Sequence, residues 1–113
     1  MINNGWIGNY SYFRARINPN SVAVHDLDEN EMYTYDELDQ RANKLANYFK
    51  EVFNLSQGDR VAFIARNRIE LIDAYYATGK TGTILVPYNA RLSVQELTEL
   101  VLKEKPKVLF YED

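Results

Sequence analysis

From residue 34 to the end of the chain, segments with helical spacing alternate with short apolar runs. The three apolar runs read RVAFIA, TILVPY and KVLFYE, and each follows a helical segment. Alternation of this kind builds a parallel sheet joined by right-handed crossover helices, so residues 34–113 are predicted to form a small α/β sandwich. A parallel sheet is normally covered by helices on both faces. Because few helices are available and the chain stops at a strand, we expect this layer to be incomplete.

Residues 1–33 show a different pattern. Four apolar residues follow helical spacing and predict a short helix: Trp6, Tyr10, Phe13 and Ile17. This helix is expected to end at the breaker Asn18-Pro19-Asn20. A β-hairpin is predicted next, because Val22–Leu27 has the composition of a strand and Asp28–Asn30 that of a turn. The chain is thus expected to contain a helix and hairpin, residues 1–33, followed by the alternating layer.

Capping patterns predict where the later helices begin and end. Three pairs of residues have the spacing of an N-terminal cap: Thr34 with Glu37, Asn67 with Glu70, and Ser93 with Glu96. The middle helix is expected to end at Gly82, because glycine readily adopts the left-handed conformation just past a helix C-terminus. The last helix is expected to stop before Pro106.

The composition narrows the classes of function. The 113 residues carry a net charge of −3 with acids and bases scattered, so no basic patch points to nucleic acid or to an anionic membrane surface. No apolar stretch reaches the about 20 residues that a transmembrane segment needs. The N-terminus has no basic residue before Arg14 and no long apolar core, unlike a secretory signal. With no cysteine in the chain, these features favour a cytoplasmic protein.

The segment Ala74–Gly82, AYYATGKTG, looks like the end of a nucleotide-binding P-loop. The motif G-x-x-x-x-G-K-[ST] needs glycine where this chain has Ala74. A P-loop also follows a strand and opens a helix, so that the positive helix N-terminus meets the phosphates. Here the segment closes a helix, where the dipole is negative. We interpret it as a helix stop, with Lys80 as a basic residue near a helix C-terminus.

Other residues that resemble parts of a metal-binding or catalytic site have simpler explanations. Asp26, Asp28 and Asn30 occupy positions 1, 3 and 5 of a calcium-binding loop, but Glu31 stands where the sharp turn needs glycine. A solvated acidic turn is therefore expected. His25, the single histidine, is expected on the surface, since neither a nucleophile nor a metal cluster accompanies it. The side chains alone predict no catalytic or metal-binding residue.

Four short motifs, in this order, resemble the start of an adenylate-forming enzyme of the acyl-CoA synthetase type. They are T-Y-x-E-L-x-x-R (Thr34 to Arg41), G-D-R-V-A (Gly58 to Ala62), the Asn67–Gly82 helix with its K-x-G end, and V-P-x-N-x-R-L (Val86 to Leu92). Each motif is weak alone, but four in register are specific, and the resemblance covers essentially all 113 residues. It implies a partial subdomain of the adenylate-forming fold, residues 1–113.

The resemblance also implies a reaction for a longer protein. A carboxylate and Mg-ATP give an acyl-adenylate and pyrophosphate, and coenzyme A then displaces AMP to form a thioester. The family's phosphate loop ends in P-K-G, and neither that ending nor the late catalytic lysine is matched in this chain. The chain is therefore expected to be an inactive piece of an acid–CoA ligase. Its partners would be the remainder of the ligase and a small carboxylic acid, and its cofactors ATP, Mg and coenzyme A.

One residue is carried over from the resemblance as a cofactor-binding candidate. In some CoA ligases a basic residue at the place of Arg91 lies near the mouth of the CoA tunnel, so Arg91 is expected to meet a CoA phosphate. An ion pair at the start of a helix explains Arg91 equally well. The segment Asn89–Leu92 favours acyl- or aryl-CoA synthetases over the adenylation domains of peptide synthetases.

A stand-alone α/β interaction or regulatory module is the alternative to a ligase. A phosphoacceptor receiver, one version of it, would need clustered acids at strand ends. The strand RVAFIARN instead ends in Arg66 and Asn67.

Overall fold

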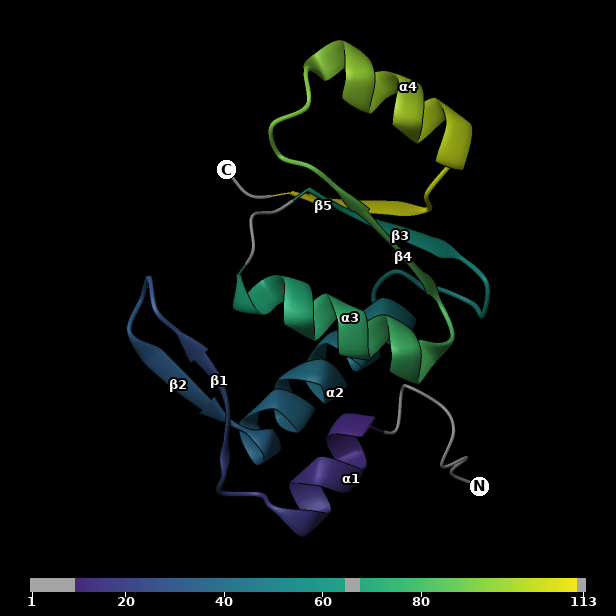
Figure 1. The fold of residues 1–113 in the computed structure, drawn as a ribbon. Helices are drawn as coiled ribbons and strands as arrows, with labels where there is room; N and C mark the ends of the chain where they lie inside the picture. The colour runs from purple at the N-terminus through teal and green to yellow at the C-terminus, as the bar shows by residue number, and fades with distance from the viewer. Residues whose placement is uncertain (1–9, 65–67, 112–113) are drawn as a thin grey trace.

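The computed structural model describes residues 10–64 and 68–111, and its elements follow the predicted order (Figure 1). The helices are α1 Tyr10–Ile17, α2 Tyr35–Glu51, α3 Ile69–Thr81 and α4 Val94–Glu104. The strands are β1 Val22–Asp26, β2 Glu31–Thr34, β3 Arg60–Ile64, β4 Ile84–Tyr88 and β5 Val108–Tyr111. None of these described helices is long and apolar enough to cross a membrane.

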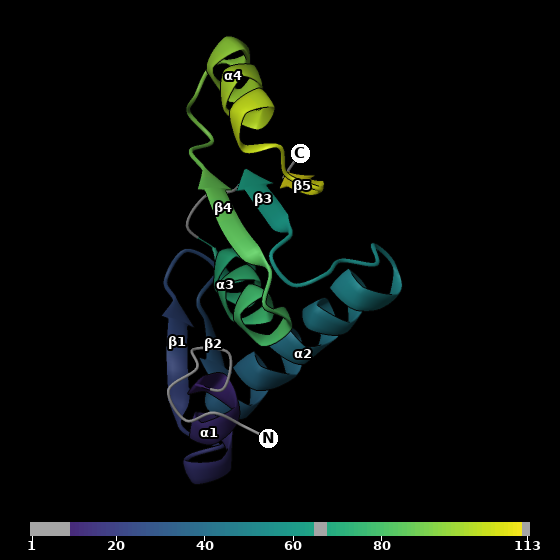
Figure 2. The same cartoon turned by 90° about the vertical axis from the view of Figure 1, so that its right-hand side faces the viewer.

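Strands β3, β4 and β5 form a parallel sheet in the order β4-β3-β5. In this register Ala62 of β3 lies between Val86 of β4 and Leu109 of β5. Helix α4 covers one face of the sheet, and α3 with α2 covers the other, as two perpendicular views show (Figure 1 and Figure 2). The predicted α/β sandwich is therefore confirmed.

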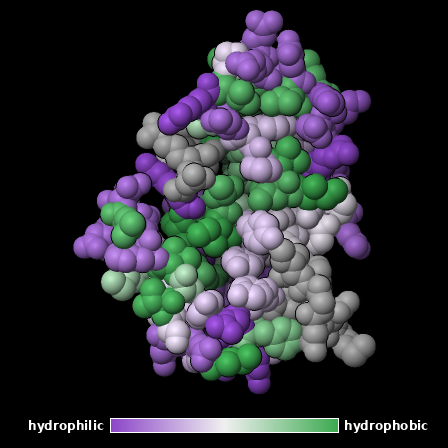
Figure 3. Space-filling view, viewed as in Figure 1, coloured by the Kyte–Doolittle hydropathy of each residue, from purple (hydrophilic) through white to green (hydrophobic). Residues whose placement is uncertain are grey.

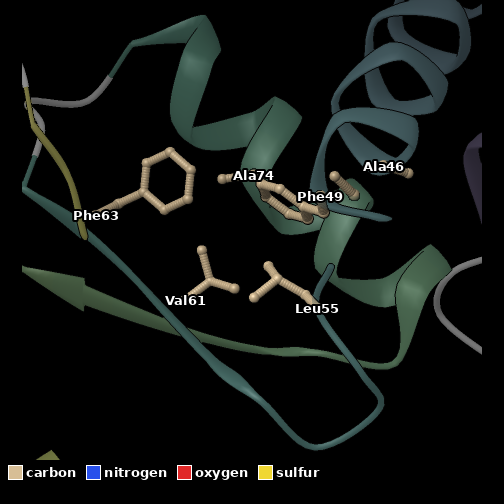
Figure 4. Close-up of a cluster of buried hydrophobic side chains, with 7 residues drawn as sticks. Ala46, Phe49, Leu55, Val61, Phe63 and Ala74 are labelled. Atoms are coloured by element: carbon tan, nitrogen blue, oxygen red, sulfur yellow. The ribbon is translucent and has the colours of Figure 1, made fainter. Parts of the chain in front are cut away.

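The hydrophobic core lies between the sheet and the α2–α3 pair (Figure 4). Phe49 of α2 and Val61 of β3 are fully buried, and Ala74 of α3 is buried beside them. The ring of Phe110 on β5 stacks on Phe63 with centroids 4.8 Å apart and lies 5.8 Å from that of Phe49. Fully burying a side chain such as Phe49 or Val61 stabilises a fold by about 1.5–3 kcal/mol. These two largest fully buried side chains both belong to this core, so this face of the sheet carries most of the packing.

The other face is packed less tightly. Helix α4 contains no buried residue. Its apolar stripe is only half-buried, and Val94 and Leu102 are 82% and 68% exposed. No second helix lies beside α4 among the described elements, so its sides stay open.

Seen from the front, apolar side chains gather in the middle of the molecule and hydrophilic ones predominate at its outer ends (Figure 3).

Two of the three predicted caps are present. At the start of α2, the Glu37 amide donates to Thr34 Oγ1 at 3.1 Å, and the Thr34 amide donates to Glu37 Oε1 at 3.0 Å. Ser93 and Glu96 form the same reciprocal pair at the start of α4. Each box satisfies two backbone amides that have no partner within the helix.

The start of α3 differs from the prediction. Its N-cap is Arg68, which makes no side-chain capping bond because a guanidinium has no acceptor oxygen to offer an amide. Asn67, the predicted cap, lies outside the described residues. The predicted end is confirmed: Gly82 is left-handed with φ 75°, and its carbonyl accepts from the Gly58 amide at 2.9 Å. This bond ties the end of α3 to the turn before β3.

The N-terminal segment is confirmed as a helix and an antiparallel hairpin. The helix, however, docks through a polar residue: Ser11 is buried, whereas Tyr10 and Ile17 are 51% and 67% exposed. Its packing therefore does not follow the apolar stripe, whose first member, Trp6, lies outside the described residues. In the hairpin turn, the Asp26 carboxylate accepts from the amides of residues 28 and 29, so it serves the turn itself.

Candidate functional site

A hollow of about 620 Å³ opens where β3 and β5 end, between α2 and the start of α3. We call it the strand-end groove. Ligands of open parallel sheets bind outside the carboxyl ends of the strands, so this is the natural candidate site. Leu45, Phe63 and Phe110 contribute apolar lining, while Arg41 and Asp73 contribute charges.

Arg41 of α2 and Asp73 of α3 form a two-pronged ion pair in the groove wall. Arg41 Nε donates to Asp73 Oδ1 at 3.0 Å, and Arg41 Nη2 donates to Asp73 Oδ2 at 2.8 Å. Burial raises the pKa of Asp73 above its ordinary value, while the hydrogen bonds from Arg41 act in the opposite direction. The pair also raises the pKa of Arg41, so its positive charge is secure. Both groups are engaged with each other, which marks the pair as a brace between helices.

The hairpin supports this brace from the other side. The Arg41 guanidinium lies over the Tyr33 ring, 5.2 Å from its centroid, in cation–π geometry. Tyr33 Oη donates to Glu31 at 2.9 Å, and that hydrogen bond is the main reason why the pKa of Tyr33 is raised. The hairpin, α2 and α3 therefore meet around one guanidinium.

A second polar cluster joins the helices away from the groove. Lys80 Nζ donates to Asp39 Oδ1 at 2.8 Å, and both side chains are largely buried. Ser11 Oγ of α1 donates to the same oxygen at 2.9 Å. Lys80 is thus near a helix C-terminus, as predicted, but its ammonium group is directed to a carboxylate of α2. The GKT segment ends a helix and ties it to its neighbours.

Arg91, the candidate carried over from the resemblance, lies in the turn between β4 and α4. Its side chain is exposed. The turn is shaped by Asn89, whose Oδ1 accepts from the Arg91 amide at 2.9 Å and whose carbonyl accepts from the Leu92 amide at 3.1 Å. Because the strands are parallel, Arg91 and the strand-end groove lie at the same end of the sheet, but Arg91 does not line the groove. The structure does not bring the two together.

The sequence analysis missed both ion pairs, although a signal was present. Asp73 stands four residues after Ile69 and four before Ala77, which are both buried on α3. A carboxylate at that spacing lies on the buried face of the helix, and a buried charge needs a partner. Asp39 carries the same signal on α2, because it stands three residues before Ala42 and seven before Ala46, which are both buried.

The described residues offer no evident metal site. Across residues 10–64 and 68–111, no three His, Cys, Asp or Glu side chains gather in a way that could hold a metal ion. His25 is exposed, as expected, and its Nε2 lies 3.3 Å from Asn30 Oδ1.

Comparison with known proteins decides the family. The family of AMP-binding enzymes matches residues 13–113, nearly the whole chain. The chain belongs to the AMP-binding enzyme family. The expected resemblance to adenylate-forming enzymes is thereby confirmed.

Similar AMP-binding enzymes include ligases that act on different acids. The chain is 33% identical over 101 residues to fatty acid–[acyl-carrier-protein] ligase ScoC of Streptomyces coeruleorubidus, covering 89% of this chain and 19% of the ligase. It is 33% identical over 111 residues to feruloyl-CoA synthase of an Amycolatopsis species, covering 98% of this chain and 22% of the synthase. The chain thus spans about a fifth of the length of the curated relatives it matches.

Solved structures of the family agree with the fold. The fatty acyl-CoA synthetase of Mycobacterium tuberculosis superposes with a TM-score of 0.88 at 28% identity, over 93% of this chain and 21% of that one. The N-terminal domain of FACL13 from the same organism also reaches a TM-score of 0.88, at 29% identity over 98% of this chain and 27% of that one. VinN, at 20% identity and a TM-score of 0.90, supports the fold alone.

Proposed function

We propose that this chain is the N-terminal α/β layer of an ATP-dependent ligase that joins a carboxylic acid to a thiol. The observation that carries the proposal is the family match over residues 13–113, together with relatives that ligate fatty or ferulic acids to coenzyme A or a carrier protein. In that protein, residues 1–113 act as one subdomain. The reaction would form an acyl-adenylate and pyrophosphate from acid and ATP, and then a thioester and AMP.

We propose that the Mg-ATP chemistry belongs to the remainder of the ligase, and two features of the described residues support this. No carboxylate cluster for a metal is present among them. The phosphate-like segment lies at the negative end of α3, with Lys80 held by Asp39. We therefore expect the 113-residue chain alone to be inactive and to show no measurable ATP binding by calorimetry. Micromolar binding would contradict this assignment. We place the ligase in the cytoplasm.

Arg91 is proposed to contact a phosphate of coenzyme A. Three features support this role: the guanidinium is exposed, the turn that carries it is fixed by Asn89, and the helix start at Ser93 lies two residues on. Helix N-termini and guanidinium groups both favour phosphate. In the active ligase, Arg91→Ala is expected to raise KM for coenzyme A about tenfold, the loss of one charge-assisted contact. Adenylate formation should be unchanged.

The first experiment is to isolate the native protein with an antibody raised against this chain and to determine its mass. A protein several times larger than 13.2 kDa that exchanges labelled pyrophosphate into ATP only when a carboxylic acid is added supports the ligase. A native mass near 13.2 kDa would favour the stand-alone interaction module. Lys103→Ala, an exposed position of α4, is the matched control for Arg91→Ala and should leave KM for coenzyme A unchanged.

A further inference from the structure

We propose that Asn89 is a positioning residue for the thioester-forming step: it holds the turn that carries Arg91, so that the guanidinium can meet a phosphate of coenzyme A. The inference rests on the proposed function, because it takes Arg91 as the group that contacts coenzyme A. It goes further in two ways. It assigns a role to a second side chain, which acts through Arg91, and it limits the effect of that side chain to one of the two steps.

Asn89 holds two successive backbone amides of the turn between β4 and α4. Its Oδ1 accepts from the Arg91 amide at 2.9 Å, and its carbonyl accepts from the Leu92 amide at 3.1 Å. The first bond makes an Asx-turn, and the second closes a β-turn with Ala90 and Arg91 at its centre. Asparagine is favoured at the first position of both turns because its short side chain reaches the amide two residues on. The backbone of Arg91 is therefore held by its own amide and by the bond that spans it.

The residues on either side anchor this turn. Tyr88, the last residue of β4, is buried with only 6% exposure. On the other side, the Ser93 amide donates to Glu96 Oε1 at 3.1 Å in the capping box of α4. Each amide of residues 91–93 thus has an acceptor, and Asn89 supplies two of the three. Because both ends are anchored, Asn89 is the residue that closes the turn between them.

A fixed turn favours phosphate binding by a long side chain. Ordering an arginine side chain on a ligand costs conformational entropy, and a mobile backbone beneath it would add to that cost. A turn that is already fixed before the ligand arrives lowers the cost. Asn89 Oδ1 binds the amide of Arg91 itself, so it also fixes the direction in which the Arg91 Cα–Cβ bond leaves the turn.

The order of the two proposed steps separates positioning from a purely structural role. The acyl-adenylate forms from acid and ATP before coenzyme A reacts. A side chain that acts only through Arg91 should therefore change KM for coenzyme A and leave adenylate formation unchanged. A side chain needed only for folding would instead lower the stability of the ligase and reduce both steps together.

Steady-state kinetics of the full-length ligase test this distinction. Asn89→Ala is expected to raise KM for coenzyme A about fivefold, the loss of one neutral hydrogen bond. Acid-dependent pyrophosphate exchange should stay within about twofold of wild type. Asn89→Ser should recover part of the loss, since its hydroxyl can accept the same amide. Gln95→Ala, which removes an exposed amide side chain in the first turn of α4, is the control and should leave KM unchanged. An unchanged KM in Asn89→Ala, or an equal loss of exchange and thioester formation, overturns the proposal.

A double-mutant cycle shows whether Asn89 acts through Arg91. In the Arg91→Ala background, Asn89→Ala should raise KM for coenzyme A no further. Two independent effects that simply multiply would overturn the positioning role. If Arg91→Ala alone leaves KM unchanged, the proposed function of Arg91 fails, and the inference fails with it. If Arg91→Ala raises KM and Asn89→Ala does not, only the inference fails.

Hydrogen exchange of the peptide covering residues 86–95, measured in the same ligase preparations, checks the turn itself. Its amides should exchange faster in Asn89→Ala than in wild type, because two of them share Asn89 as acceptor residue. Arg91→Ala should leave the exchange unchanged, since its backbone amide remains. Faster exchange with an unchanged KM would show that the turn does not control coenzyme A binding. Exchange that Asn89→Ala leaves unaltered would show that Asn89 does not hold the turn.

Discussion

Arg41 and Asp73, 32 residues apart in sequence, meet through three hydrogen bonds of 2.8–3.1 Å and brace α2 against α3. The Asp73 side chain is only 11% exposed and the Arg41 side chain 36%. Removing either partner therefore leaves a charge in an environment that solvates it poorly. Stability, rather than catalysis, is the property that this pair should control.

Arg41→Ala is expected to lower the free energy of unfolding by about 2 kcal/mol, less than for a fully buried pair because water reaches Arg41. Urea unfolding measures the change. Lys44→Ala, an exposed position on the same helix, is the control and should stay within about 0.5 kcal/mol of wild type. In a double-mutant cycle with Asp73→Asn, the second substitution should cost much less in the Arg41→Ala background. Strict additivity would show that the pair contributes no coupling.

The loss caused by Arg41→Ala should depend on pH. Burial already raises the pKa of Asp73 above 3.8, and removing Arg41 takes away the hydrogen bonds that hold it down. A raised pKa in the folded state contributes stability below the unfolded value, and this contribution is lost as the pH rises through the folded value. The difference between Arg41→Ala and wild type is therefore expected to be small near about pH 3.5 and full at about pH 7. A difference that stays constant between these values would contradict the assignment to Asp73.

The second cluster offers a graded test of burial. Lys80→Met should destabilise the chain by about 2–3 kcal/mol, because the buried Asp39 carboxylate loses its counter-charge. Ser11→Ala removes one neutral donor and should cost about 1 kcal/mol. Thermal unfolding would rank the two variants. If Ser11→Ala were the more destabilising variant, the docking of α1, and not the ion pair, would make the larger contribution to stability at this cluster.

Two left-handed glycines form a matched pair for testing local strain. Gly82 has φ 75°, and an added Cβ would lie 2.9 Å from Gln57 Cγ, whereas Gly58 has φ 89° with nothing within 4 Å. Gly58→Ala should cost about 1 kcal/mol from backbone strain alone. Gly82→Ala should cost at least as much, and more if the Gln57 side chain cannot move aside. Adding Gln57→Ala to Gly82→Ala separates the two contributions: stability should return to the level of the Gly58→Ala loss.

Local chemistry explains which parts of this fold the sequence predicts. The caps at Thr34 and Ser93 depend on a residue three positions away, and the end of α3 depends on one glycine. Each of these features can therefore be predicted from a few neighbouring residues of the sequence. The order of strands and helices follows from spacing alone in the same way. These are the features that the structure confirms.

The features that were missed depend on distant partners. Lys80 and Asp39 are 41 residues apart, and no window of sequence shows that the two helices will bring them together. The docking of α1 through Ser11 is decided by the same carboxylate. The weak burial of α4 follows from the lack of a neighbouring helix among the described elements, a property of the assembled layers. Arg91 was predicted from the family resemblance, and it does not line the strand-end groove.

The two ion pairs have reversed polarity. In one, α2 supplies the acid, Asp39, and α3 the base, Lys80; in the other, α2 supplies the base, Arg41, and α3 the acid, Asp73. If α3 were inverted end over end against α2, Asp39 would meet Asp73 and Arg41 would meet Lys80. The two ion pairs therefore favour the observed direction of α3 over the reversed one, in which like charges would meet. Packing between small alanine side chains would distinguish the two directions poorly.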